Sequence, residues 1–152
     1  MALTRTALFL LYPADFFWTI CGSHVDDHCS RTPSLRHRND LHRVRCCSEN
    51  PFGTLNSVLN EGCSVYGASH LGESNTCFSG KTHAEAEQIC SDNGGRLCTR
   101  EEIEADCTAF TGCGFNHDVV WTSTSAAVEE EPLLLVDLGD MPILIAGEGL
   151  GR

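Results

Sequence analysis

The chain has 152 residues, which fits one small domain and leaves little room for a second. Its formal net charge is −11, and residues 44–124 alone hold eleven acidic side chains against four basic ones. Because nucleic-acid binding depends mainly on lysine and arginine, this balance argues against a nucleic-acid partner. It suits an exported domain that meets cations or basic partners.

Residues 1–23 have the elements of a signal-like segment. Arg5 precedes an apolar run at residues 7–12, a proline and an aspartate interrupt that run, and residues 20–23 form the expected cleavage region. The alternative is a chain start without a targeting role. A membrane span needs about 20 apolar residues, and no run approaches that length, so we expect no span.

Residues 24–43 carry four histidines and four arginines without hydrophobic periodicity. His24, His28 and Cys29 have side chains of the types that bind metals, but a polar, disordered linker explains the composition better. The sequence therefore predicts that the folded module begins near residue 44.

Ten cysteines are present, and eight of them lie between residues 46 and 113. An even number in one stretch suits a closed set of disulfides, which supplement the small core of a short domain. Spacing does not fix the pairing. We expect the neighbours Cys46 and Cys47 to bond to separate partners. The disulfide candidates are Cys46, Cys47, Cys63, Cys77, Cys90, Cys98, Cys107 and Cys113.

Two capping boxes, each a threonine followed three residues later by a glutamate, mark two short helices. Thr82 and Glu85 open the first helix, which ends at residues 93–95, where Asn-Gly-Gly supplies left-handed conformers. The second capping box starts at Thr99, and its helix runs to about Cys107.

Short strands are expected around these helices, at residues 63–66, 76–78 and 119–122, with an extended link at residues 96–98. We therefore predict an α+β fold: a small disulfide-rich module at residues 44–124, with two capped helices and a few short antiparallel strands.

Residues 125–152 form an acidic tail without cysteine. Its two apolar patches, at residues 133–136 and 143–146, either form two short strands or are disordered.

One spacing offers a different chemistry. Cys98, Cys107, Cys113 and His117 are spaced as in a Cys3His zinc finger, so a finger that binds RNA is the alternative function. Against it, the first gap is the second capped helix, and residues 98–117 carry a net charge of −3. A zinc finger that binds RNA needs positive charge to contact the phosphate backbone. A single zinc ion also leaves the other cysteines unused, so we expect no metal or cofactor.

Other candidate sites have simpler explanations. Within residues 44–124, Cys113 and His117 are the closest thiol–imidazole pair in sequence, and a bridged cysteine beside a surface histidine explains them better than a nucleophile does. The four acids at residues 101–106 suit a solvated helix face better than a calcium site. Trp121 is expected in the core rather than as a sugar-stacking platform. We expect no enzyme.

The segment CFSGKTHAEAEQICSDNGGRLCTREEIEADC, at residues 77–107, resembles the two-helix half of the C-type lectin-like superfamily, which includes the Link modules. With the paired Cys-Cys, the Thr-Gly-Cys-Gly and the closing Val-Trp-Thr-Ser, residues 44–124 are similar to an uncharacterised cysteine-rich domain. That domain occurs in extracellular proteins of unicellular marine eukaryotes.

The resemblance implies a C-type-lectin-like fold and a non-enzymatic, secreted or cell-surface binding or adhesion module. Its partner is an unknown extracellular protein or glycan. The Glu-Pro-Asn, Gln-Pro-Asp and Trp-Asn-Asp motifs of the calcium-dependent sugar binders do not occur in the sequence, so calcium-dependent carbohydrate binding is not implied.

Overall fold

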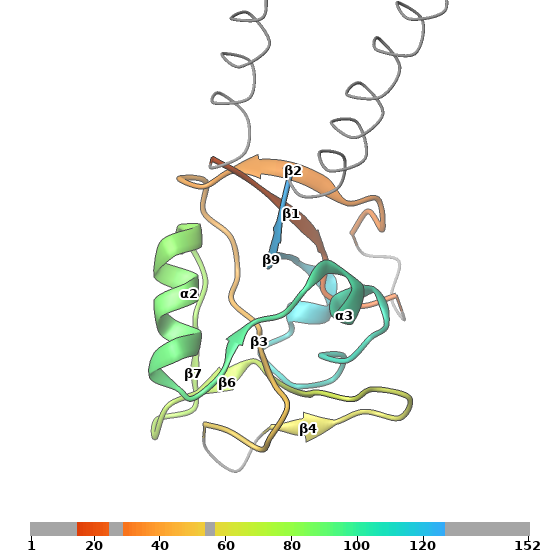
Figure 1. The fold of residues 1–152 in the computed structure, drawn as a ribbon, viewed down its shortest axis with the longest axis vertical. Helices are drawn as coiled ribbons and strands as arrows, with labels where there is room; N and C mark the ends of the chain where they lie inside the picture. The colour runs from red at the N-terminus through yellow and green to blue at the C-terminus, as the bar shows by residue number, and fades with distance from the viewer. Residues whose placement is uncertain (1–14, 25–28, 54–56, 127–152) are drawn as a thin grey trace, which may run out of the picture.

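The computed structural model describes residues 15–24, 29–53 and 57–126 (Figure 1). These residues form three small antiparallel sheets, two short α-helices and one 3-10 helix. The prediction of a disulfide-rich α+β module is confirmed, whereas the likeness to the C-type lectins stays a prediction. Within the described ranges, neither helix has the length and apolar character needed to cross a membrane.

The first sheet joins the two ends of the described chain and has the order β2-β1-β9. The central strand β1 (Phe16–Cys21) is rich in aromatic and β-branched residues, which favour strands. It pairs antiparallel with β2 (Ser34–His37) on one side and with β9 (Val119–Ser125) on the other. All three strands lie at the top of the view in Figure 1.

This sheet corrects the sequence boundaries at the start of the module. Residues 20–23, the expected cleavage region, are buried, and cleavage there would remove β1 from the sheet. Residues 29–43 are no disordered linker, because they contain β2 and a bridge between His42 and Lys81. The sequence was misleading because the apolar residues of β1 follow the signal-like run after only a short interruption at Pro13 and Asp15. Residues 1–14 and the tail from 127 lie outside the described residues.

The second sheet has the order β4-β5-β3-β8. Its strands are β3 (Cys46–Ser48), β4 (Val58–Leu59), β5 (Tyr66–Ala68) and β8 (Arg96–Leu97). A small hairpin, β6 (His70–Leu71) with β7 (Thr76–Cys77), forms the third sheet.

The strand expected at residues 63–66 begins later than predicted, at Tyr66. A turn delays it: the amide of Cys63 donates to the carbonyl of Asn60, and Gly62 between them has a φ of +82°.

The first helix, α2 (His83–Asp92), confirms its capping box. The hydroxyl of Thr82 accepts from the amide of Glu85, and the Glu85 carboxylate accepts from the amide of Thr82 at 2.9 Å. The helix ends at Asn93, and Gly94 follows with a φ of +83°. This helix stands along the left side of the molecule in Figure 1.

The second helix, α3 (Arg100–Glu104), has the predicted capping box at Thr99 but is shorter than expected. It ends at Ala105 because Asp106 adopts a left-handed conformation with a φ of +59°. The prediction that this helix reaches Cys107 is wrong.

Two groups of buried apolar side chains make up the core. The first, the α2 cluster, consists of Val44, Cys46, Phe52, Ala68, Leu71, Ala86, Cys90, Leu97 and Trp121. The second, the loop cluster, consists of Ile20, Cys47, Val65, Cys98, Ile103, Cys107, Phe115 and Val120. Trp121 is fully buried, and its indole N–H donates to the carbonyl of Lys81 at 2.7 Å. It is therefore a core residue and offers no surface on which a sugar ring could stack.

Candidate functional site

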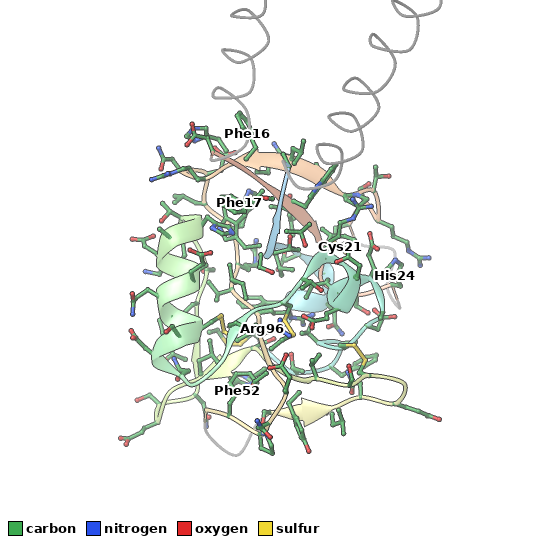
Figure 2. The ribbon with its side chains drawn as sticks, in the orientation of Figure 1. Phe16, Phe17, Cys21, His24, Phe52 and Arg96 are labelled. Carbon is green, nitrogen blue, oxygen red and sulfur yellow. A yellow bond between two sulfur atoms is a disulfide. The ribbon has the colours of Figure 1, made fainter. Side chains whose placement is uncertain are left out.

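All ten cysteines are paired in five disulfides, some of which are drawn in yellow in Figure 2. The pairs are Cys21–Cys29, Cys46–Cys90, Cys47–Cys98, Cys63–Cys107 and Cys77–Cys113. The eight candidates bond among themselves, and the neighbours Cys46 and Cys47 bond to separate partners. Sequence reasoning missed the fifth bridge, since both of its cysteines precede the expected module boundary.

The residues of the zinc-finger alternative do not converge. Cys98, Cys107 and Cys113 belong to three different bridges, so none offers a thiolate to a shared ion. The finger prediction is therefore contradicted. The same pairing removes Cys113 as a nucleophile beside His117, because a bridged sulfur carries no thiol.

The acids at residues 101–106 do not form a shared cation site either. Glu102 accepts two hydrogen bonds from Arg96, at 2.7 and 2.9 Å, and Glu104 accepts from Arg100 at 2.8 Å. The carboxylate of Asp106 accepts from the backbone amide of His24. These three carboxylates therefore point to different partners.

The segment that stands out is the loop between α3 and β9, residues 105–118, which contains one short 3-10 helix, η1 (Phe115–His117). Three of its non-glycine residues are left-handed: Asp106 at +59°, Phe110 at +61° and Cys113 at +62°. Such a conformation costs about 1–3 kcal/mol per residue and persists only where the surroundings determine it. We call this segment the 105–118 loop.

Residues far from this loop in the sequence bind or contact it. The side-chain amide of Asn60 donates to the carbonyls of Asp106 and Ala109, both at 2.9 Å, and also to that of Cys107. Gly67 in β5 lies so close beneath the loop that an added Cβ would come within 2.6 Å of the Cys107 carbonyl oxygen. Two disulfides, at Cys107 and at Cys113, fasten the loop covalently.

The guanidinium of Arg45 supports the loop from below. Arg45 is fully buried, and its Nε donates to the hydroxyl of Ser69 at 2.9 Å. Its Nη1 donates to the carbonyl of Gly22 at 2.6 Å and to the hydroxyl of Thr108 at 3.3 Å. Its Nη2 donates to the side-chain oxygen of Asn116 at 2.8 Å. One side chain thus joins the end of β1, the β5–β6 connection and the loop.

All of these acceptors are neutral, so the positive charge of Arg45 has no direct counter-ion among the described residues. Burial lowers the pKa of Arg45 to about 10, and the charges of Asp106 and Asp118 oppose this shift. At neutral pH the guanidinium is still protonated and donates all four hydrogen bonds. The buried cation is therefore stabilised by direct hydrogen bonds to neutral acceptors and, at longer range, by the charges of Asp106 and Asp118.

Phe110 projects from the loop into solvent. Its exposed fraction of 69% is the highest among the large apolar side chains of the described chain, ahead of Leu41 at 60%. Its backbone amide donates to the side-chain oxygen of Asn116 at 3.1 Å, and the same oxygen accepts from Arg45. Asn116 therefore connects the buried guanidinium to the residue that displays the aromatic ring.

Only part of this site is predictable from the sequence. Gly112 and Gly114, on either side of Cys113, are typical of a tight turn, and both have positive φ. Nothing local marks Asp106 or Phe110 as left-handed. Burial of Arg45 is equally invisible in the sequence, because its partners lie 23 to 71 residues away.

No family model matches the chain, and no curated protein and no solved structure is significantly similar to it.

Proposed function

We propose that this protein is a non-enzymatic binding or adhesion module, secreted or displayed at the cell surface, with a C-type-lectin-like scaffold. Its contact surface is the 105–118 loop, with Phe110 at the centre. The observation that carries the proposal is the exposed Phe110 ring, held on a left-handed residue of a loop fastened by two disulfides.

A fixed aromatic side chain suits binding for an energetic reason. Aromatic residues are prominent among the side chains that provide most of the binding energy at protein interfaces. Association also costs conformational entropy, which is smaller when the contacting segment is already ordered. The bridges, Asn60 and Asn116 order this loop before any partner arrives. These surroundings thus offset the cost of the left-handed conformation at Phe110 and keep the exposed ring in place.

Disulfide usage supports an extracellular location. Five bridges use every cysteine of the chain, and such bridges persist in oxidising compartments and are rare in the cytosol. The same pairing leaves no free thiol to act as a nucleophile.

Charge indicates the kind of partner. Residues 44–124 have a net charge of −7, and such a domain favours partners with basic groups around the apolar contact. We therefore expect an extracellular protein or glycan that combines an apolar or ring-shaped contact for Phe110 with a positively charged or neutral rim.

The test uses the full chain, folded with its bridges intact and presented as a multivalent probe to arrays of extracellular proteins and of glycans. Phe110→Ala is expected to weaken binding about thirtyfold, which corresponds to about 2 kcal/mol at a central contact residue. Leu41→Ala is the matched control, because Leu41 is similarly exposed but lies outside the loop, between β2 and β3. Equal binding by the two variants would contradict the role of the loop.

A further inference from the structure

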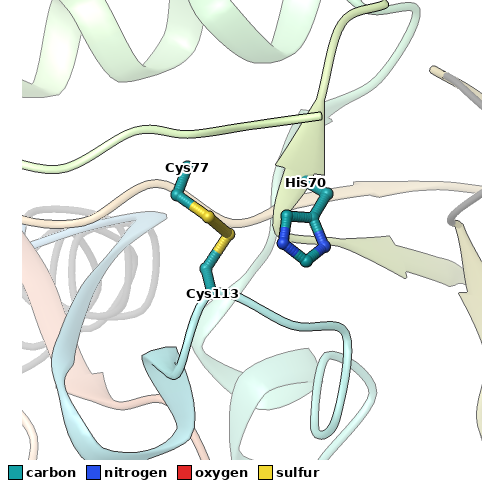
Figure 3. Close-up of side chains that lie close together, drawn as sticks. All are labelled: His70, Cys77 and Cys113. Atoms are coloured by element: carbon teal, nitrogen blue, oxygen red, sulfur yellow. A yellow bond between two sulfur atoms is a disulfide. The ribbon is translucent and has the colours of Figure 1, made fainter. Parts of the chain in front are cut away.

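A histidine lies beside one of the five bridges. His70 begins β6 and Cys77 ends β7, and the two residues face each other directly across the hairpin. Their side chains therefore lie on the same face of the hairpin. Cys113 reaches them from the 105–118 loop and bonds to Cys77. Figure 3 shows the imidazole of His70 next to the disulfide.

The three side chains form a compact group of metal-binding atoms. A ring nitrogen of His70 and the two sulfurs of Cys77 and Cys113 all lie within 4.8 Å of one another. In a tetrahedral zinc site with zinc–sulfur bonds of about 2.3 Å and zinc–nitrogen bonds of about 2.0 Å, ligand atoms are roughly 3–4 Å apart. If the two bonded sulfurs moved apart to that spacing, the three atoms would be arranged as in such a site.

This bridge is also the most accessible of the five. Cys77 is exposed and Cys113 is half-buried, whereas each of the other bridges has at least one buried half. Both halves of Cys46–Cys90 have no exposed surface at all. Because exchange requires a thiolate to reach a disulfide sulfur, a reductant attacks the Cys77–Cys113 bridge first.

We propose that reduction of the Cys77–Cys113 disulfide by a dithiol creates a binding site for Zn²⁺, formed by these two sulfurs and His70. The dithiol supplies two electrons and two protons and becomes a disulfide, while the Cys77–Cys113 bond opens to two thiols. Zn²⁺ binding then releases both protons, and the two thiolates and one imidazole nitrogen occupy three positions. The fourth position remains open to water or to an added ligand.

The rest of the fold keeps these ligands together after the bridge opens. The β6–β7 pairing holds His70 opposite Cys77 without help from the disulfide. The 105–118 loop remains fastened by Cys63–Cys107 and by the hydrogen bonds of Asn60, so Cys113 stays close. The site differs from the zinc finger expected from spacing, because its histidine comes from 43 residues upstream of Cys113 rather than from His117.

The first measurement establishes which bridge opens. The full chain is treated with graded dithiothreitol, its free thiols are alkylated, and the labelled cysteines are mapped by peptide mass spectrometry. Cys77 and Cys113 are expected to be labelled while the other eight cysteines remain protected. Earlier labelling of another pair would overturn the proposal.

The second measurement follows metal binding to the partly reduced protein, freed of dithiothreitol under anaerobic conditions. Zn²⁺ is titrated against a chromophoric chelator, and Co²⁺ replaces it to give the absorption of a thiolate-ligated ion. One ion per chain is expected after reduction and none before it. Absence of binding after selective reduction would contradict the proposal.

Two histidine variants separate this site from binding by the cysteines alone. His70→Ala is expected to weaken Zn²⁺ binding at least about tenfold. Loss of a residue that only hydrogen-bonds to a metal ligand already costs about that much, and loss of the ligand itself should cost more. His117→Ala, the matched control on the neighbouring loop, should bind like the unaltered chain. Unchanged binding by His70→Ala, or an equal loss in His117→Ala, would overturn the assignment. The ring of His70 packs closely against Gly112, so the alanine variant could lose a packing contact. His70→Gln keeps a polar side chain at this position and replaces the alanine variant if that variant fails to fold.

Discussion

The α2 side of the molecule and the 105–118 loop satisfy their backbone groups in different ways. Helix α2 uses its own hydrogen bonds, and its first turn is closed by Thr82 and Glu85, three residues apart. Ala86 and Cys90 on its inner face pack into the α2 cluster. The hydrogen bonds that cap and form this helix are therefore mostly local, while the amide of His83 donates to the carbonyl of Arg38 and Cys90 is bridged to Cys46.

The loop combines short-range hydrogen bonds, such as that from the Ala109 amide to the Asp106 carbonyl, with partners from distant parts of the chain. Asn60 lies about 46 to 49 residues from the carbonyls that it binds, and Arg45 lies 71 residues from Asn116. An irregular segment of this kind depends on a few remote polar side chains, each of which serves several loop groups. We therefore expect single substitutions to damage the loop more than the helix.

The largest effect is expected from Arg45→Met, which removes the guanidinium but keeps an apolar stem. The acceptors on Gly22 and Ser69 would then be buried without this donor, and Asn116 would keep only the Phe110 amide; each lost partner costs about 1–3 kcal/mol. We expect the free energy of unfolding to fall by about 3 kcal/mol or more. Denaturant unfolding with all bridges intact measures this.

Arg96→Met is the control for that experiment. Arg96 binds Glu49 and Glu102 but is partly exposed, with a side-chain exposure of 38%. Partly exposed ion pairs contribute about 0–1 kcal/mol, so this change should cost far less. Equal losses in the two arginine variants would contradict the special role of Arg45.

The second effect concerns Asn116, whose side-chain oxygen accepts from both Arg45 and Phe110. Asn116→Leu is expected to lower the free energy of unfolding by about 2 kcal/mol, because the buried guanidinium of Arg45 and the partly buried amide of Phe110 lose their acceptor. Asn116→Asp keeps the acceptor and gives Arg45 a counter-charge, so most of the loss should be recovered at pH 7.

The recovery by Asn116→Asp should depend on pH. The neighbouring guanidinium would hold the pKa of the new carboxyl below its unfolded value of about 3.9. Its stabilisation would be complete above that value and would be lost as the pH falls through the folded pKa. Recovery that is the same at pH 7 and at pH 3 would show that charge plays no part.

A smaller and local effect is expected from Thr82→Ala, which removes the N-cap of α2. Loss of such a cap costs about 1 kcal/mol. Hydrogen exchange should quicken in the first turn of α2 and remain unchanged in the 105–118 loop. Faster exchange in the loop would show that the two regions are coupled.

The smallest effect is a dependence of stability on pH from His83, which is buried against Phe17 and Trp121. Burial lowers the pKa of His83 below 6.5, and its hydrogen bond to the Thr122 carbonyl and the nearby Glu87 oppose this shift. Because the unfolded chain then takes up the proton more readily, stability is complete above pH 6.5 and declines as the pH falls toward the folded pKa.

Unfolding midpoints between pH 8 and pH 5 measure that decline. His83→Gln should unfold with a flatter dependence on pH over this range, although His42, whose pKa burial also lowers, leaves part of the slope. A slope that does not change in the variant would assign the dependence to other groups.

The sequence by itself determined the features that rest on near neighbours. The capping boxes at Thr82 and Thr99, the end of α2 at Asn93 and the strand at residues 119–122 are encoded within a few residues, and all four are present. The cysteine content likewise indicated a disulfide-rich module, because the number of cysteines needs no knowledge of geometry.

Only the tertiary structure decided the features that depend on distant contacts. The place of β1 between β2 and β9, the pairing of ten cysteines, the burial of Arg45 and the exposure of Phe110 all join residues far apart in the chain. No local signal specifies such contacts, since their free energy arises only when the separate segments pack together.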